Sequence, residues 1–264
     1  MAVSSSKKEA LKLIEFLNRK VEEYDKPEFI PDDPICVPHR FTKKADIEIA
    51  GLFASIFAWG NRTTIINKSN ELMKRMHDSP HDFVLHHTDK DLRDLLDFKH
   101  RTFNATDLLY FIDFLNRHYS RFDSLETAFS QWMDSGAEDI TQALNGFYTY
   151  FFTGEDVPSR TRKHIAAPMR QSTCKRLNMY LRWMVRQDRS GVDFGIWNTI
   201  SPSQLICPID VHVARVARRF GLLDRNQVDW QAALELTAYL RKMDPADPVK
   251  YDFALFGLGV VEKY

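Results

Sequence analysis

Apolar residues recur at helical spacing along almost the whole chain, and this periodicity constrains the fold more than any other feature. Near the N-terminus, Leu11, Ile14, Leu17 and Val21 step by three or four residues, which is typical of an amphipathic helix. Signals for strands are absent. The chain of 264 residues also has only 10 Gly and 11 Pro, too few for the tight turns of an all-β protein of this size. The sequence therefore predicts an all-α protein.

The pattern falls into two helical blocks. In the first, residues 45–59 are apolar on nearly all sides, which predicts a buried central helix. This block follows a Pro-rich loop at 27–38 and continues with predicted helices at 63–77, 80–86, 89–96, 104–119, 123–134 and 138–152. A long polar connection, 153–171, leads to the second block, with predicted helices at 173–187, 208–221, 229–242 and 247–257.

Several classes of protein are disfavoured. No apolar stretch approaches the roughly 18 residues of a membrane span, and the N-terminus has no apolar signal core. Three widely spaced Cys residues cannot form a disulfide framework. A metal enzyme would have to use His81, His86 and His87, but adjacent His86 and His87 point to different helix faces. We expect a cytoplasmic, monomeric protein with no membrane contact, no metal and no cofactor.

Positive charge is concentrated in one segment, although the chain as a whole is neutral. Lys+Arg and Asp+Glu are equal, at 36 each. Between Pro158 and Ser190, nine Lys or Arg residues stand against one acid, Asp188, which gives a local charge of +8. Such a basic band can follow a phosphate backbone, or it can be a solvated loop and helix face. Neutral net charge therefore does not count against a nucleic-acid partner.

Within this basic band, arginines are interleaved with aromatic residues. Arg182 and Arg186 lie four residues apart and share one face of the predicted helix, with Tyr180 and Trp183 nearby. Arginine together with aromatic rings favours phosphate contact combined with base stacking.

The helix predicted at 208–221 carries three distinct stripes. The apolar stripe consists of Ile209, Val213, Val216 and Phe220. The stripe of small residues consists of Ala214, Ala217 and Gly221, headed by Asp210. The basic stripe consists of His212, Arg215 and Arg219. Asp210 stands in the first turn, where the helix dipole favours the ionised carboxylate. A carboxylate in this position can stabilise a developing cation or activate water. It can also simply cap the helix.

The same segment resembles the helix-hairpin-helix DNA glycosylase superfamily of the endonuclease III type. In that superfamily a Pro/Val–Asp–x–His–Val/Ile–x–Arg–Val–x–x–Arg pattern supplies the catalytic Asp. The matching residues here are Pro208, Asp210, His212, Val213, Arg215, Val216 and Arg219. The resemblance implies that Asp210 is a catalytic carboxylate and that His212 and Arg215 contact DNA.

A second resemblance concerns residues 174–182. In the type-2 8-oxoguanine glycosylases, a helix of the form Lys–x–Ala–Ser–x–Phe–Leu–Arg carries the nucleophilic Lys, and the run from Cys174 to Arg182 looks similar. Lys175 would then be the nucleophile. Its neighbours in sequence include Arg176 and Arg182 but no acid within ten residues, which favours the free amine. The alternative is a solvent-exposed lysine in the basic band.

A third resemblance lies at 45–68, which looks like the first barrel helix of these glycosylases. The end of that helix supplies polar residues that fill the duplex after a base has left it, and Asn61 and Arg62 are the candidates here. Asn61 can alternatively be a helix C-cap. The superfamily's glycine hairpin is missing, because residues 158–174 contain no Gly. The basic band, with Arg170, Arg176, Arg182 and Arg186, would take over its contacts with DNA phosphates.

Together these resemblances imply two helical lobes with a DNA-binding cleft between them. Residues 45–206 would form a barrel lobe that holds Lys175. Residues 1–44 and 207–264 would form the second lobe, which holds Asp210. The two side chains must then face each other across the cleft.

The implied function is base-excision repair. A glycosylase/lyase would remove a damaged base, an oxidised purine by the second resemblance, from double-stranded DNA. Trp59, Trp183 and Phe253 are candidate walls of the base pocket, with Trp197 as a further aromatic candidate. A catalytically inactive relative that binds DNA or RNA is the alternative.

Overall fold

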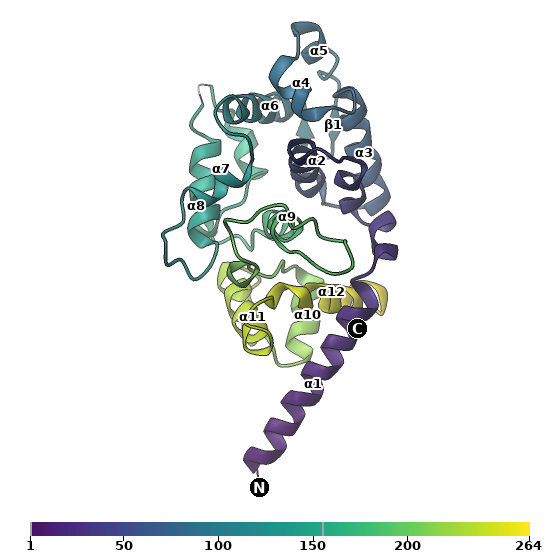
Figure 1. The fold of residues 1–264 in the computed structure, drawn as a ribbon, viewed down its shortest axis with the longest axis vertical. Coiled ribbons are helices and arrows are strands. Elements are labelled where there is room, and N and C mark those ends of the chain that lie inside the picture. Colours follow the sequence, from purple (N-terminus) through teal and green to yellow (C-terminus); the bar gives the residue numbers. More distant parts are fainter. Residues whose placement is uncertain (1, 155) are drawn as a thin grey trace.

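The structure is a computed structural model that describes residues 2–154 and 156–264, and it is mostly helical (Figure 1). This agrees with the predicted helical character. Within the described ranges one short hairpin departs from it, in which β1 (Lys99–His100) pairs antiparallel with β2 (Phe103–Asn104). Strands of two residues are too short to produce the alternation by which strands are recognised in a sequence.

The α-helices follow the predicted order, with ends that differ by a few residues. Their bounds are α1 (Ala2–Tyr24), α2 (Lys44–Phe57), α3 (Arg62–Arg75), α4 (Pro80–His86), α5 (Asp89–Arg93), α6 (Ala105–Tyr119), α7 (Glu126–Ser130), α8 (Thr141–Phe151), α9 (Lys175–Val185), α10 (Val211–Arg219), α11 (Trp230–Met243) and α12 (Tyr251–Phe256). A π-helical turn, η8 (Gly257–Val261), continues α12.

Short 3-10 helices occupy the two segments that the sequence predicts as loops. The Pro-rich segment forms η1 (Pro27–Asp32), η2 (Pro34–Cys36) and η3 (Pro38–Arg40). The polar connection contains η4 (Ser159–Lys163) and η5 (Pro168–Arg170). The remaining two are η6 (Pro202–Gln204) and η7 (Pro248–Lys250). Prolines begin most of these turns because a first helical position needs no N–H donor.

Helix α2 is the buried central helix that the sequence predicts. Every residue from Ala45 to Phe57 is buried, and the helix packs against α9, α3 and α4. Gly51 permits the closest part of the contact with α9. A Cβ atom built there would lie 2.9 Å from Met184 Cε and 3.3 Å from Tyr180 Cε2. The packing of α2 thus fixes where α9, and Lys175 at its start, can lie.

The first and last α-helices lie side by side, with the later part of α1 against α12 (Figure 1). Helix α1 packs against α12, and α12 packs against α10. Gly257 lies against the ring of Tyr24, since a Cβ atom there would come within 2.3 Å of that ring. Helix α9 lies between this group and the helices of residues 44–151 in Figure 1. Among the described residues, no helix combines the length and apolar character needed to cross a membrane.

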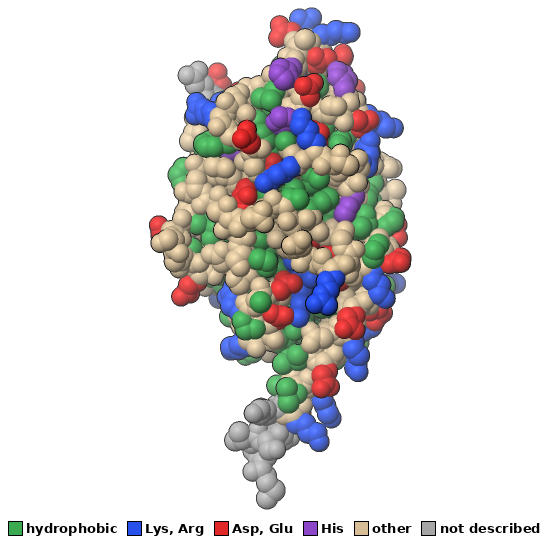
Figure 2. All heavy atoms as spheres, viewed as in Figure 1, with side chains coloured by type: hydrophobic (Ala, Val, Ile, Leu, Met, Phe, Trp, Pro, Cys, Tyr) green, Lys and Arg blue, Asp and Glu red, His purple; other side chains and the backbone are tan. Residues whose placement is uncertain are grey.

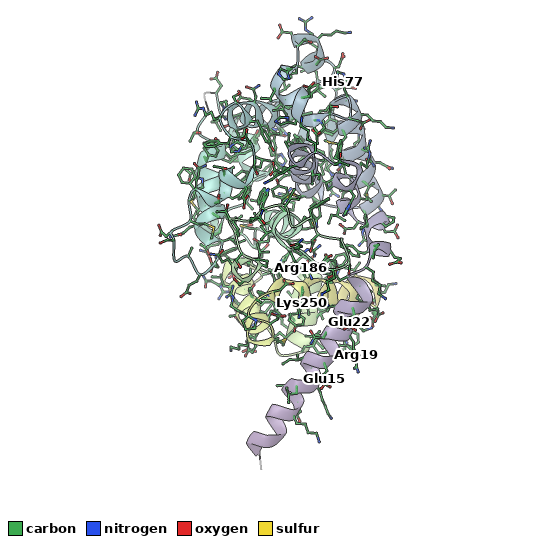
Figure 3. All side chains as sticks on the ribbon, in the orientation of Figure 1. Glu15, Arg19, Glu22, His77, Arg186 and Lys250 are labelled. Atoms are coloured by element: carbon green, nitrogen blue, oxygen red, sulfur yellow. The ribbon has the colours of Figure 1, made fainter. Side chains whose placement is uncertain are left out.

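On the face drawn in Figure 2, acidic and basic side chains are interspersed rather than gathered by sign. The concentration of positive charge predicted for residues 158–190 is divided in the structure, because Arg182 and Arg186 point inward whereas Arg189 is exposed. Arg182 and Arg186 have side chains only 5% and 6% exposed (Figure 3 labels Arg186).

The two buried arginines are neutralised by aspartates from distant parts of the chain. Arg182 pairs with Asp193 and Asp252, and Arg186 contacts Asp25 at 2.9 Å. Arg186 further contacts three more carboxylates: Asp247 at 2.8 Å, Asp193 at 3.0 Å and Asp188 at 3.3 Å. Neither guanidinium reaches the surface, so the prediction that they contact DNA phosphates is corrected. They instead tie α9 to the end of α1 and to α12.

Candidate functional site

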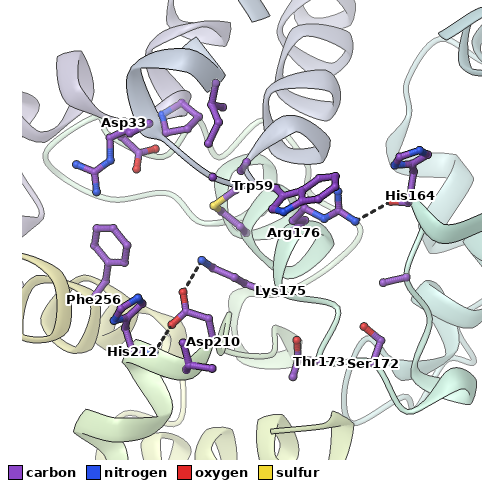
Figure 4. Close-up of a pocket in the computed structure, with 18 of the residues that line it drawn as sticks. Asp33, Trp59, His164, Ser172, Thr173, Lys175, Arg176, Asp210, His212 and Phe256 are labelled. Carbon is purple, nitrogen blue, oxygen red and sulfur yellow. Dashed lines mark hydrogen bonds and ion pairs between the residues drawn. The ribbon is translucent and has the colours of Figure 1, made fainter. Parts of the chain in front are cut away.

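Lys175 and Asp210 meet at the centre of the candidate site. They are 35 residues apart in the chain, and Lys175 Nζ lies 2.6 Å from Asp210 Oδ2 (Figure 4). Lys175 is the first residue of α9, and Asp210 immediately precedes α10. Both side chains remain partly accessible, at 31% and 21%. The two helix starts therefore converge and bring a cation and an anion together.

Asp210 acts as helix cap and ion-pair partner at once, because its two oxygens have different roles. Oδ1 accepts hydrogen bonds from the N–H groups of His212 and Val213, both at 2.9 Å, while Oδ2 faces Lys175. Burial opposes ionisation, but Lys175 and the two N–H groups outweigh it, so the pKa of Asp210 is lowered. The carboxylate is thus held charged beside the lysine.

The loop before Lys175 achieves its turn without glycine. Gln171 and Cys174 adopt left-handed backbone conformations, with φ of 57° and 51°. This conformation costs about 1–2 kcal/mol for a residue that bears a Cβ atom. Cys174 is held by its N–H bond to Ser172 Oγ, and Asn178 Nδ2 donates to the carbonyl of Thr173. These contacts define the turn that leads directly into Lys175.

Lys175 does not stand among cations alone, as its neighbours in sequence suggest. Lys175 pairs with Asp210, and it also lines a small recess of about 30 Å³ together with Asp33 and Asp252. The absence of acids within ten residues of Lys175 in the sequence therefore does not describe its surroundings in space, because these three carboxylates come from other segments.

An open pocket of about 830 Å³ lies over the Lys175–Asp210 pair (Figure 4). This is within the usual range of volumes for small-molecule sites. The residues that line it come from the η2 region, α2–α3, the polar connection and the starts of α9 and α10, and they include Asp33, Trp59, Arg62, Lys163, His164, Thr173, Arg176, Met179, His212 and Phe256.

Three of the residues predicted to contact DNA line this pocket. Arg62 places its guanidinium over the Phe256 ring, 5.4 Å from the centroid. Arg176 donates to the carbonyls of Ile56 and His164, so part of its hydrogen-bonding capacity is used within the fold. His212 is exposed at the pocket wall beside Asp210.

The other predicted DNA contacts lie outside the pocket lining. Asn61 caps the start of α3 by accepting from Thr64 N at 3.1 Å, so it is an N-cap rather than the C-cap of α2. Arg170 is exposed and donates to Tyr148 Oη at 2.7 Å. Arg215 is also exposed and holds the carbonyls of Gly259 and Tyr264.

The three candidate base-pocket aromatics have different surroundings. Trp59 is 37% exposed, lines the pocket and carries Arg101 over its ring at 4.6 Å. Phe253 is buried but lines the recess beside Lys175. Trp183 is fully buried and lines neither space, so its assignment to the base pocket is corrected. Trp197 is likewise buried and donates to Glu48.

Sequence reasoning missed two buried polar residues at this pocket. His164 is 2% exposed and has its Nε2 3.2 Å from Asp107. Asp33 is 7% exposed and lines both the pocket and the recess. Asp33 stands in a Pro-rich segment with no helical pattern, so no sequence signal marks it.

No cluster of three His, Cys, Asp or Glu side chains suited to a metal ion occurs among the described residues. Each of the three histidines of the metal-enzyme alternative has another contact within 3.1 Å: His81 with Lys43, His86 with Asp82 and His87 with the carbonyl of Phe83.

The comparisons with known proteins place the chain in a family. The family described as "Protein of unknown function (DUF2400)" matches residues 33–261, which include every pocket residue named above. The chain therefore belongs to the DUF2400 family. It matches no curated protein and no solved structure.

Proposed function

We propose that this member of the DUF2400 family excises a damaged base from double-stranded DNA, with Lys175 as nucleophile and Asp210 as its acid–base partner. The observation that carries this proposal is the 2.6 Å contact between Lys175 Nζ and Asp210 Oδ2 at the open pocket. An adjacent proton acceptor is one of the ways in which an amine nucleophile is activated.

The proposed reaction uses the three protons of the Lys175 ammonium. Asp210 Oδ2 accepts one of them, and the free amine attacks C1′ of the deoxyribose. The bond between C1′ and the base breaks, and the departing base takes one proton. Opening of the sugar ring places a second proton on O4′. The third proton stays on the resulting Schiff base, which keeps the positive charge. β-Elimination from this intermediate then cleaves the strand on the 3′ side.

DNA would approach the pocket between two helical lobes. One lobe would consist of residues 45–206, and the other of residues 1–44 together with 207–264. The cleft between them would accept the duplex. Arg62, Lys163 and Arg176 line the pocket and suit phosphate contacts. The target nucleotide must leave the base stack to bring C1′ to Lys175, at a cost of a few kcal/mol.

Borohydride trapping tests the mechanism. Duplexes of one sequence, each with a different damaged base, are incubated with the protein and sodium borohydride. Covalent protein–DNA adducts are then quantified by gel electrophoresis. We expect an adduct with at least one lesion, an oxidised purine first, and its loss in Lys175→Gln.

Lys90→Gln is the control, because Lys90 is an exposed lysine outside the pocket lining, so its loss should leave the adduct intact. No adduct with any lesion, together with unchanged DNA binding in Lys175→Gln, would refute the mechanism. Salt-sensitive DNA binding without an adduct would identify the catalytically inactive relative instead. Stronger competition by structured RNA than by duplex DNA would identify an RNA-binding protein.

A further inference from the structure

The fold uses only one oxygen of the Asp33 carboxylate. It is 7% exposed, and its Oδ1 accepts a hydrogen bond from Ile35 N at 3.0 Å at the start of η2. Its Oδ2 makes no hydrogen bond or ion pair with any described residue. Oδ2 is not among the fully buried oxygens that lack a partner, so it remains accessible from the pocket that Asp33 lines. An acceptor that the fold leaves free at a pocket wall is available to a ligand that presents N–H donors.

The unpartnered side of Asp33 faces the space in front of Lys175. Asp33, Lys175, Met179 and Phe256 each line both the open pocket and the small recess, so the two spaces meet at these residues. Figure 4 shows the Asp33 carboxylate directed into the pocket, on the side of Phe256. The recess has a volume of about 30 Å³, enough for a single water but not for a base. A base would therefore lie in the open pocket and present one edge to Asp33.

Three cations near Asp33 favour its ionised, hydrogen-bond-accepting form. Burial raises the pKa of this carboxyl, while the hydrogen bond from Ile35 N and the charges of Arg182, Arg62 and Lys175 offset part of that rise. These cations surround the group without forming an ion pair with it. A carboxylate accepts hydrogen bonds only, so it recognises edges that present N–H donors.

We propose that Asp33 selects the base: its Oδ2 accepts hydrogen bonds from adjacent N–H groups on the edge of the extruded base. A guanine-type edge, with N1–H beside the exocyclic amine, satisfies this acceptor. An adenine-type edge presents the ring N1 as an acceptor and leaves two acceptors facing each other. This inference rests on the proposed function, because it names the substrate class of that same pocket.

Met179 and Phe256 supply the apolar contacts that a flat ring needs. Both line the open pocket and the recess, and both side chains are partly buried rather than sealed in the core. Thioether and aromatic groups both pack well against ring faces. The donor edge would meet Asp33, while the bond to the sugar would point toward Lys175 and Asp210.

The test measures base binding without requiring catalysis. The probes are 9-methylguanine, 9-methylhypoxanthine and 9-methyladenine, in which the methyl group replaces the sugar, and affinities are compared by saturation-transfer NMR. We expect the wild-type protein to bind 9-methylguanine at least about tenfold more tightly than 9-methyladenine. The reason is that the Asp33 oxygen and the adenine ring N1 would face each other as two acceptors without a shared proton. Removal of one donor in 9-methylhypoxanthine should give an intermediate affinity.

Asp33→Asn should abolish this preference and keep the fold. Asparagine caps helices as well as aspartate does, so the bond to Ile35 N is retained, while the amide places a donor where an acceptor stood. Thermal melting verifies folding. Asp46→Asn is the matched control, because Asp46 is another buried carboxylate that accepts a backbone N–H, from His81, but lines neither the pocket nor the recess.

The outcomes separate this inference from the proposed function. An unchanged guanine-to-adenine ratio in Asp33→Asn, or no binding of any methylated base to the wild-type protein, overturns the role of Asp33, whatever the trapping assay gives. Loss of the ratio in Asp33→Asn supports it, even where no borohydride adduct forms. In that last case the excision mechanism fails and a base-binding pocket remains.

Discussion

Replacement of Arg186 by Met should strongly destabilise the fold at neutral pH. The guanidinium contacts Asp25, Asp188, Asp193 and Asp247 at distances from 2.8 to 3.3 Å, and its side chain is 6% exposed. Removing one partner of a buried ionic cluster leaves the other charges uncompensated and costs about 3–5 kcal/mol. For a chain of this size, that loss corresponds to a decrease in melting temperature of roughly 6–20 °C.

The same variant should show a characteristic dependence on pH. Burial raises the pKa of Asp25 and of Asp193 to about 6, although Arg186 opposes the rise in both cases. Because the folded-state pKa lies above the usual value of 3.8, the folded state gains stability as pH falls through about 6. Without Arg186 both pKa values rise further. The stability deficit of the variant should therefore shrink between pH 8 and pH 5.

Urea unfolding followed by circular dichroism at pH 8, 6.5 and 5 measures both effects. Arg189→Met is the control, because Arg189 is an exposed arginine three residues along and should change stability by less than about 0.5 kcal/mol. A deficit in Arg186→Met below about 1 kcal/mol at pH 8, or one that stays constant down to pH 5, would refute this reasoning.

Three further outcomes are expected. Asp210→Asn should remove the borohydride adduct yet keep the unfolding free energy within about 1 kcal/mol of wild type, because asparagine can still cap α10; a larger loss in urea unfolding would contradict this. Glu48→Ala should lower the free energy of urea unfolding by about 3 kcal/mol or more, because it leaves buried donors on Tyr119, Leu125 and Trp197 without an acceptor. A loss below about 1 kcal/mol would show that these donors find other partners. Gly51→Val should lower the free energy of unfolding by about 1–3 kcal/mol, because the new side chain clashes with α9. An unchanged urea midpoint would mean that Met184 and Tyr180 move aside without cost.

Helical periodicity proved informative where burial and local hydrogen bonding set the structure. Residues 45–57 are apolar all round and form the buried helix α2. Helix ends were less predictable, because caps depend on a few local contacts. Asn61 is an example: the sequence allows it to end one helix, but the structure uses it to begin α3. Similarly, the pattern at 123–134 yields only the short helix α7.

Charge patterning misled the interpretation of α9. Counting charges within residues 158–190 gives a basic band, but a count along the chain does not show which side chains point inward. Asp25, which pairs with Arg186, is 161 residues away. Trp183 similarly lies in the core rather than in the pocket. These outcomes depend on which face of α9 meets α1 and α12.

Sequence pattern was enough to predict the helical class, the buried central helix and the helical character of the two segments that carry Lys175 and Asp210. Local pattern suffices for these, because they depend on contacts within one or two helical turns. The packing of the helices, in contrast, brings the Lys175 and Asp210 side chains to 2.6 Å and places Asp33 at the same pocket. Such contacts join segments far apart in the chain, so helix packing alone sets them.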